Sequence, residues 1–86
     1  MSNPKLILVT GGAGYIGSVL VGKLVEHGYQ VRVLDSAIYG LSGITKYIEN
    51  NTIELVVGDT RNENIVEKSV KDVDCVIHLA AIVGEP

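Results

Sequence analysis

The sequence predicts an α/β fold in which a parallel sheet of about four strands carries helices on both faces. Continuous apolar runs, typical of strands buried on both faces, alternate with segments whose apolar residues recur at helical spacing. No turn signal joins two such runs into a hairpin, which favours βαβ units. Because crossovers between parallel strands are right-handed, the expected strand order is 3-2-1-4. A chain of 86 residues has room for one small domain of this kind.

The expected elements alternate along the whole chain. Strands are expected at Lys5–Thr10, Gln30–Asp35, Ile53–Val57 and Asp74–Leu79. Helices are expected at Gly14–His27, at Ile44–Glu49 and from about Glu63 to Lys71. Gly28 is placed to end the first helix in the left-handed conformation, Asn50-Asn51 predicts a turn, and Asn62 can cap the third helix.

Side-chain spacing predicts which helix faces are buried. The apolar stripe of the first helix consists of Ile16, Val19, Leu20 and Leu24. The inward-facing residues expected on the third helix are Ile65, Val66 and Val70. The single cysteine, Cys75, is expected to be a small buried hydrophobic residue, and it excludes an internal disulfide.

Composition narrows the classes of partner. Seven Lys and Arg against ten Asp and Glu give a net charge of −3, and the cations are scattered singly. This pattern predicts neither a nucleic-acid partner nor an anionic membrane surface. No apolar stretch approaches the ~20 residues of a membrane span, and the run after Lys5 is too short for a signal peptide. We therefore expect a cytoplasmic protein, and no metal site.

A glycine-rich loop, Thr10–Ser18, connects the first expected strand to the first helix. Gly12, Gly14 and Gly17 form the pattern G-x-G-x-x-G, and Gly11 replaces Gly12 in the alternative pattern G-x-x-G-x-x-G. In either pattern the glycines permit a tight turn, approach of a pyrophosphate to the backbone, and close packing of helix on strand. No Gly-Lys-Ser/Thr follows, so a P-loop is excluded. The strand before the loop and the helix after it favour a Rossmann-type dinucleotide site over a turn kept only for packing.

The helix after the loop and an acid on the second strand complete the predicted site. Backbone N–H groups at the helix start, first of all those of Tyr15 and Ile16, are expected to bind the phosphates. Asp35 stands 18 positions after Gly17 at the end of the second strand, where an acid accepts hydrogen bonds from the adenosine ribose. Its carboxylate would repel a 2′-phosphate, and Arg32 lies within the strand, so NAD is favoured over NADP. The alternative is that Asp35 is an ordinary turn residue.

Four segments together resemble the extended short-chain dehydrogenases/reductases, the NAD-dependent epimerase/dehydratase group that acts mostly on nucleotide sugars. The segments are Thr10–Ser18, Leu34-Asp35, Gly58-Asp59-Thr60-Arg61 and His78-Leu79-Ala80-Ala81. They occur in the family's order and spacing and span nearly the whole chain. The resemblance implies NAD as cofactor and, in a full-length parent, a nucleotide sugar as substrate.

The resemblance also implies further cofactor contacts. Asp59 resembles the family's acid whose carboxylate contacts the adenine amino group, with the backbone of Thr60 beside it. Without the resemblance, the position of Asp59 fits a turn residue or a helix cap equally well. Leu79–Ala81 resembles the segment that passes under the pyrophosphate and nicotinamide ribose. His78 is expected to be a packed, hydrogen-bonded residue at a strand end. The expected cofactor-binding residues are Gly11, Gly12, Gly14, Tyr15, Ile16, Gly17, Asp35, Ser36, Asp59, Thr60, Leu79, Ala80 and Ala81.

The family's catalytic Tyr-x-x-x-Lys pair has no counterpart. The positions four residues after Tyr15, Tyr29, Tyr39 and Tyr47 hold Val19, Val33, Gly43 and Asn51. We therefore interpret residues 1–86 as the N-terminal part of a dinucleotide-binding domain without its catalytic and substrate-binding parts, and expect no catalytic residue. A free-standing nucleotide-binding module and a purely structural domain are the alternatives.

The expected topology leaves the edge of the fourth strand without a neighbour. Exposed strand edges recruit partners, and large apolar patches seldom remain in water. The sequence therefore predicts self-association, in its simplest form a two-fold homodimer.

Overall fold

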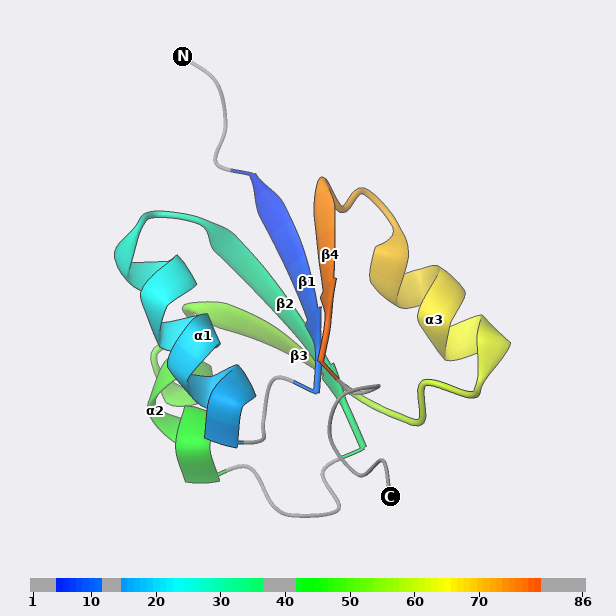
Figure 1. The fold of residues 1–86 in the computed structure, drawn as a ribbon, viewed down its shortest axis with the longest axis horizontal. Helices are drawn as coiled ribbons and strands as arrows, with labels where there is room; N and C mark the ends of the chain where they lie inside the picture. The colour runs from blue at the N-terminus through cyan, green and yellow to red at the C-terminus, as the bar shows by residue number, and fades with distance from the viewer. Residues whose placement is uncertain (1–4, 12–14, 37–41, 80–86) are drawn as a thin grey trace.

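The computed structural model describes residues 5–11, 15–36 and 42–79, which form a four-stranded parallel sheet with helices on both faces (Figure 1). The strands are β1 (Leu6–Thr10), β2 (Gln30–Asp35), β3 (Ile53–Val57) and β4 (Cys75–His78). The helices are α1 (Tyr15–Glu26), α2 (Thr45–Glu49), which follows a short 3-10 turn at Ser42–Ile44, and α3 (Glu63–Val70). None of the helices in these ranges is long and apolar enough to cross a membrane.

The strand order β3-β2-β1-β4 confirms the predicted topology. Val9 in β1 pairs with Val33 in β2 and with Ile77 in β4, while Val33 pairs with Leu55 in β3. Side chains alternate between the two faces of a strand, so these four residues share one face of the sheet. The observed ends of the elements differ from the expected ones by a residue or so.

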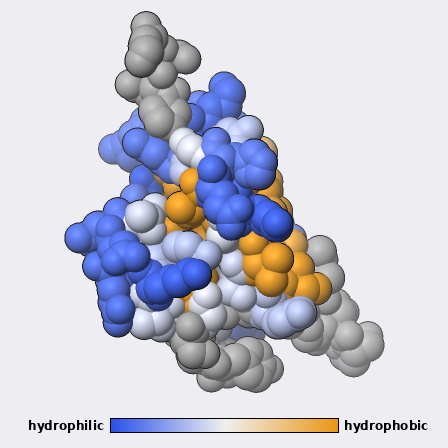
Figure 2. All heavy atoms as spheres, turned by 90° about the vertical axis from the view of Figure 1, so that its left-hand side faces the viewer, coloured by the Kyte–Doolittle hydropathy of each residue, from blue (hydrophilic) through white to orange (hydrophobic). Residues whose placement is uncertain are grey.

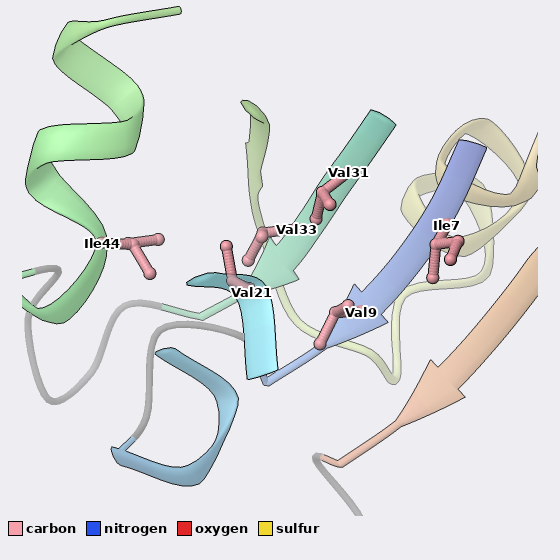
Figure 3. Close-up of a cluster of buried hydrophobic side chains, with 6 residues drawn as sticks. All are labelled: Ile7, Val9, Val21, Val31, Val33 and Ile44. Atoms are coloured by element: carbon pink, nitrogen blue, oxygen red, sulfur yellow. The ribbon is translucent and has the colours of Figure 1, made fainter. Parts of the chain in front are cut away.

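The main core lies between the sheet and the helices α1 and α2. Its buried side chains gather from β1, β2, α1 and the turn before α2 (Figure 3). They are Ile7, Val9, Val21, Val31, Val33 and Ile44. Helix α3 lies on the other face of the sheet (Figure 1). On that face Leu8 and Leu34 are fully buried. Burial on both faces explains why β1 and β2 are continuous apolar runs rather than alternating ones.

The predicted apolar stripe of α1 is wrong in part. Leu20 and Leu24 are half-buried against the core, but Ile16 and Val19 are 58% and 52% exposed. The buried face centres instead on Gly17, Val21 and Gly22. Glycines bring the helix backbone close to its neighbours, and a Cβ on Gly22 would stand 2.6 Å from the hydroxyl oxygen of Tyr47 in α2. Apolar surface is consequently exposed on this side of the molecule (Figure 2).

Two further burial predictions are corrected by the structure. On α3, Val70 is 41% exposed and Ser69 is fully buried in its place, with its hydroxyl donating to the carbonyl of Ile65 at 2.8 Å. Cys75 is exposed rather than buried. Cys75 is exposed because its strand, β4, lies at the edge of the sheet and pairs only with β1 among the described strands.

The predicted helix ends are confirmed. Gly28 has a φ of +86°, and the N–H groups of Gly28 and Tyr29 donate to the carbonyls of Val25 and Leu24, as in a Schellman motif. Asn51 ends α2 in the same left-handed region, with φ of +57°. The side chain of Asn62 accepts hydrogen bonds from the backbone of the first turn of α3.

Arg32 attaches α3 to the sheet. Its side chain, 14% exposed, forms an ion pair with Glu54 on the neighbouring strand at 3.0 Å. Its Nη1 donates to the carbonyls of Ser69 at 2.7 Å and Lys71 at 2.9 Å. These carbonyls lie at the C-terminal end of α3, where the helix supplies no donors of its own. Arg32 thus acts as the cap of α3.

We predict that Arg32→Met destabilises the chain by about 1–3 kcal/mol, the cost of leaving the part-buried carbonyl of Ser69 without its charged donor. Methionine retains an apolar stem of similar length, so the loss reports on the guanidinium. Urea unfolding followed by circular dichroism measures it, with Lys68→Met, a charge-matched change at an exposed position of α3, as the control. Equal unfolding midpoints for the two variants would contradict this role.

Candidate functional site

The four sequence segments singled out above end at the same edge of the sheet. Parallel strands place all their carboxyl ends together, and hydrogen bonds continue from strand to strand at this edge. They join Gly11 N to Leu34 O at 2.8 Å, Gly58 N to Asp35 O at 2.9 Å, and Leu79 N to Thr10 O at 2.9 Å. Gly11, the two acids at the ends of β2 and β3, and Leu79 therefore lie at one edge of the sheet. In open α/β sheets, this is the edge at which ligands bind.

Gly11 makes the turn out of β1. Its φ of +80° lies in the left-handed region, where a Cβ is costly, and it follows the buried Thr10 directly. The chain can thus turn out of the sheet directly after Thr10. Of the other glycines of the loop, Gly12 and Gly14 lie outside the described residues, and Gly17 is buried in the first turn of α1.

The N-terminal end of α1 offers hydrogen-bond donors to an anion. Helix geometry leaves the first N–H groups, those of Tyr15, Ile16 and Gly17, without acceptors within the helix, at its positive dipole end. The first turn contains no acidic residue that would repel a phosphate. The side chains of Tyr15 and Ile16 are 86% and 58% exposed, so this end of the helix is open to solvent. This environment suits a pyrophosphate.

Asp35 is the last residue of β2, the strand that pairs with β1. Its residue is half-buried, its carbonyl accepts from Gly58, and Ser36 after it is exposed. Arg32, three residues earlier, points to the opposite face of the sheet, where α3 and Glu54 occupy its guanidinium. This agrees with the prediction that Arg32 is no partner for a 2′-phosphate at Asp35.

Asp59 follows the end of β3 and is paired with Arg61. Two donors of the Arg61 guanidinium contact the carboxylate at 2.7–3.1 Å, and the backbone N–H of Arg61 donates to Oδ1 at 2.8 Å. These hydrogen bonds lower the pKa of Asp59 from 3.8 to about 2, and the same contact raises the pKa of Arg61. Thr60, between the two, is half-buried. Asp59 is therefore an ionised acceptor.

Sequence reasoning did not assign a role to Arg61. The available signal was its spacing, since an aspartate just after a strand can accept from the backbone two residues later and so hold the intervening turn. Long side chains at that second position can return to the same carboxylate, as Arg61 does.

His78 ends β4 and contacts the end of β1. Its Nδ1 shares a hydrogen bond with the hydroxyl of Thr10, which confirms the predicted bonding. The ring is exposed, however, so the expectation of a packed histidine is wrong, again because β4 is at the sheet edge. Leu79 is half-buried beside it, and Ala80 and Ala81 lie outside the described residues.

The described residues provide hydrogen-bonding groups along one edge of the sheet, and they include no tyrosine and lysine in the spacing Tyr-x-x-x-Lys. Donors for phosphate, a carboxylate for a ribose and a second carboxylate lie along one edge. The sequence contains no tyrosine followed four positions later by lysine. Within residues 5–11, 15–36 and 42–79, no group of three His, Cys, Asp or Glu side chains could hold a metal ion.

Comparisons with known proteins identify the family of this chain. Residues 7–86 match the model of the NAD dependent epimerase/dehydratase family. A putative UDP-glucose 4-epimerase from Methanocaldococcus jannaschii is 47% identical over 77 residues, which cover 88% of this chain and 24% of that protein.

Solved structures of similar proteins share the fold. An epimerase from Methanothermobacter thermautotrophicus superimposes with a TM-score of 0.79 at 37% identity, covering 90% of this chain and 23% of the epimerase. A dTDP-glucose 4,6-dehydratase from Bacillus anthracis, solved in complex with NAD, gives a TM-score of 0.78 at 29% identity, covering 86% of this chain and 26% of the dehydratase.

The chain thus spans about a quarter of the length of these relatives. The part it shares with them is the Rossmann-type parallel sheet with its helices. By its sequence and by its fold, the chain belongs to the NAD-dependent epimerase/dehydratase family.

Proposed function

We propose that this chain binds NAD across the carboxyl edge of its sheet, as the cofactor-holding part of a nucleotide-sugar epimerase, dehydratase or reductase. The observation that carries the proposal is the convergence at that edge of the Gly11 turn, the start of α1 and the acids that follow β2 and β3. Each supplies what one part of a dinucleotide requires. The family to which the chain belongs is described as NAD-dependent, which supports the same cofactor.

The strand order supports the following placement of the cofactor along the edge of the sheet. The pyrophosphate binds the N–H groups of Tyr15 and Ile16 above β1, at the centre of the sheet. The adenosine half extends over β2 and β3, with Asp35 and Ser36 at the ribose and Asp59 and Thr60 at the adenine. The nicotinamide half extends over β4, beside Leu79, Ala80 and Ala81. In this proposal Gly11, Gly12, Gly14 and Gly17 have no side chains to hinder the approach of the pyrophosphate to the backbone.

The residues at the adenosine end favour NAD over NADP. A 2′-phosphate placed at Asp35 would bring two negative charges together. The nearest arginine on the same strand, Arg32, is held on the other face by Glu54 and by the end of α3. The ribose hydroxyls of NAD, in contrast, are donors that a carboxylate accepts.

When bound, NAD supplies the hydride acceptor and donor of the family's chemistry. The chain's own residues bind and orient the cofactor, and no Tyr-x-x-x-Lys pair is present to move a proton. We therefore propose that these 86 residues alone bind NAD without catalysis, in the cytoplasm. A nucleotide sugar is the substrate only of a protein in which further residues complete the site.

The cofactor proposal predicts that the folded chain binds NADH and that Asp35→Ala weakens this binding about tenfold, as expected for loss of hydrogen bonds to a charged group. Binding of NADPH should weaken less, because the variant also removes the repulsion of its 2′-phosphate. NADH fluorescence titration measures both affinities. Glu26→Ala, at the far end of α1, removes the same charge away from the site and serves as the control.

Two outcomes would count against this assignment. Failure of the folded wild-type chain to bind NADH at millimolar concentration would refute the cofactor proposal. An unchanged preference for NADH over NADPH in Asp35→Ala would remove Asp35 from the ribose site.

We also propose that two copies of the chain associate through β4. In the described part of the sheet, β4 pairs on one side only, and its four residues, Cys75–His78, include no Asp, Glu, Lys, Arg or Pro. Charged residues or proline usually prevent a natural edge strand from pairing with another chain, and β3 contains such a residue in Glu54. Val76 is 48% exposed, so the edge is open to a second strand.

Light scattering at micromolar concentration should therefore report a dimer for the wild-type chain and a monomer for Val76→Lys, since a lysine on an edge strand opposes strand pairing. The matched control is Val57→Lys, at a 56% exposed position on β3, which should remain dimeric. A monodisperse wild-type monomer, or equal masses for the two variants, would overturn the proposed interface.

A further inference from the structure

The side chain of Arg61 makes three contacts to the carboxylate of Asp59 and is nevertheless almost fully exposed to solvent. The side chain of Arg61 is 90% exposed and that of Asp59 is 47% exposed. Nε of Arg61 lies 3.1 Å from both carboxylate oxygens, and Nη2 lies 2.7 Å from Oδ2. An exposed pair of this kind adds little to stability. Its geometry suggests another use.

The contacts fix the orientation of the Asp59 carboxylate. A single ion pair would leave the carboxylate free to rotate, but here the backbone N–H of Arg61 holds Oδ1 while the guanidinium spans both oxygens. Planar two-point contacts between arginine and carboxylate impose direction as well as charge. The turn itself is anchored, because Gly58 donates to Asp35 and Asn62 donates to the carbonyl of Asp59.

The fixed carboxylate is still open to a ligand. An ionised carboxylate is an acceptor with about four lone-pair sites, and nearly half of the Asp59 side chain is exposed. In the described part of the chain, Arg61 is the charged group that contacts it. At the adenine end of a dinucleotide, the exocyclic amino group of the base is the donor that such an acceptor selects.

We propose that Arg61 is a positioning residue for base recognition, which holds the Asp59 carboxylate so that its open side accepts the exocyclic amino group of adenine. This inference rests on the proposed NAD site and adds a specificity-determining role for Arg61. A base that carries a carbonyl oxygen at the same position presents an acceptor there in place of the donor, and the carboxylate repels that oxygen. Arg61 thereby makes the site selective for an amino-bearing purine.

The first measurement tests the pairing without any cofactor. Carboxyl carbon NMR follows the titration of Asp59 in the wild-type chain and in Arg61→Ala, which retains the backbone N–H and removes only the guanidinium. The pKa of Asp59 should be about 2 in the wild type and should rise towards 3.8 in the variant, because the ionised form loses its partner. Equal values would overturn the proposal, since Arg61 would not hold Asp59 in solution.

The second measurement compares NADH with reduced nicotinamide hypoxanthine dinucleotide, which replaces the adenine amino group by a carbonyl oxygen. Fluorescence titration of the wild-type chain should show roughly tenfold tighter binding of NADH, as for a hydrogen bond to a charged group. Arg61→Ala should reduce this preference to about threefold or less, and Arg61→Lys, which keeps the charge without the two-point contact, should give an intermediate value. Lys68→Ala is the control for net charge, at an exposed site of α3.

The outcomes separate this inference from the cofactor proposal. If the wild type binds neither dinucleotide, the NAD site is refuted and the role of Arg61 with it. If the wild type binds both and Arg61→Ala keeps the full preference for NADH, only the inference about Arg61 fails. Tighter NADH binding by Arg61→Ala would also overturn it, because Arg61 would then compete with the base for Asp59.

Discussion

The parallel direction of all four strands is the constraint on which the site depends. It places the carboxyl end of every strand at one edge of the sheet. Residues far apart in sequence, such as Gly11 and Asp59, therefore lie at the same edge although they do not contact each other directly. The hydrogen bonds from Gly11 to Leu34, and from Gly58 to Asp35, carry this order one residue beyond the strands. Because the backbone makes these bonds, the positions of the loop and of both acids follow from strand register.

A parallel sheet needs cover on both faces, and the chain meets this requirement in two different ways. On one face, α1 packs directly on apolar side chains such as Val9 and Val33. On the other, Arg32 reaches from β2 to the carbonyls at the end of α3, so a polar cap adds to burial of Leu8 and Leu34. The guanidinium of Arg32 is thereby held on the face of the sheet that α3 covers, by Glu54 and by the end of α3.

The strands, their order and the helix ends could be predicted from sequence because each depends on local signals or on general rules of handedness. The apolar run of β1, the glycine after α1 and the asparagine before α3 are such signals. Rotation of a helix about its axis is not local. The spacing of Ile16 and Val19 indicates an apolar stripe, but Gly17 and Gly22 turn a different side of α1 to the sheet. Likewise, an apolar strand segment does not reveal whether its neighbour is present, which is why Cys75 was expected to be buried. The backbone contact between Asp59 and Arg61 follows from their spacing, but the guanidinium contact depends on the rotamer of Arg61, which spacing does not determine.

Electrostatics explains why the site contains acids although its proposed ligand is an anion. In a chain of net charge −3, the pyrophosphate cannot rely on a basic patch, and the backbone donors at the start of α1 provide for it. The carboxylates stand further along the edge, where the ligand presents hydroxyl and amino donors instead of phosphate. Asp59 would still add negative charge to this surface, but its pairing with Arg61 cancels that charge at long range while leaving acceptor oxygens at short range. Directional recognition and tolerance of an anionic ligand can thus coexist on one sheet edge.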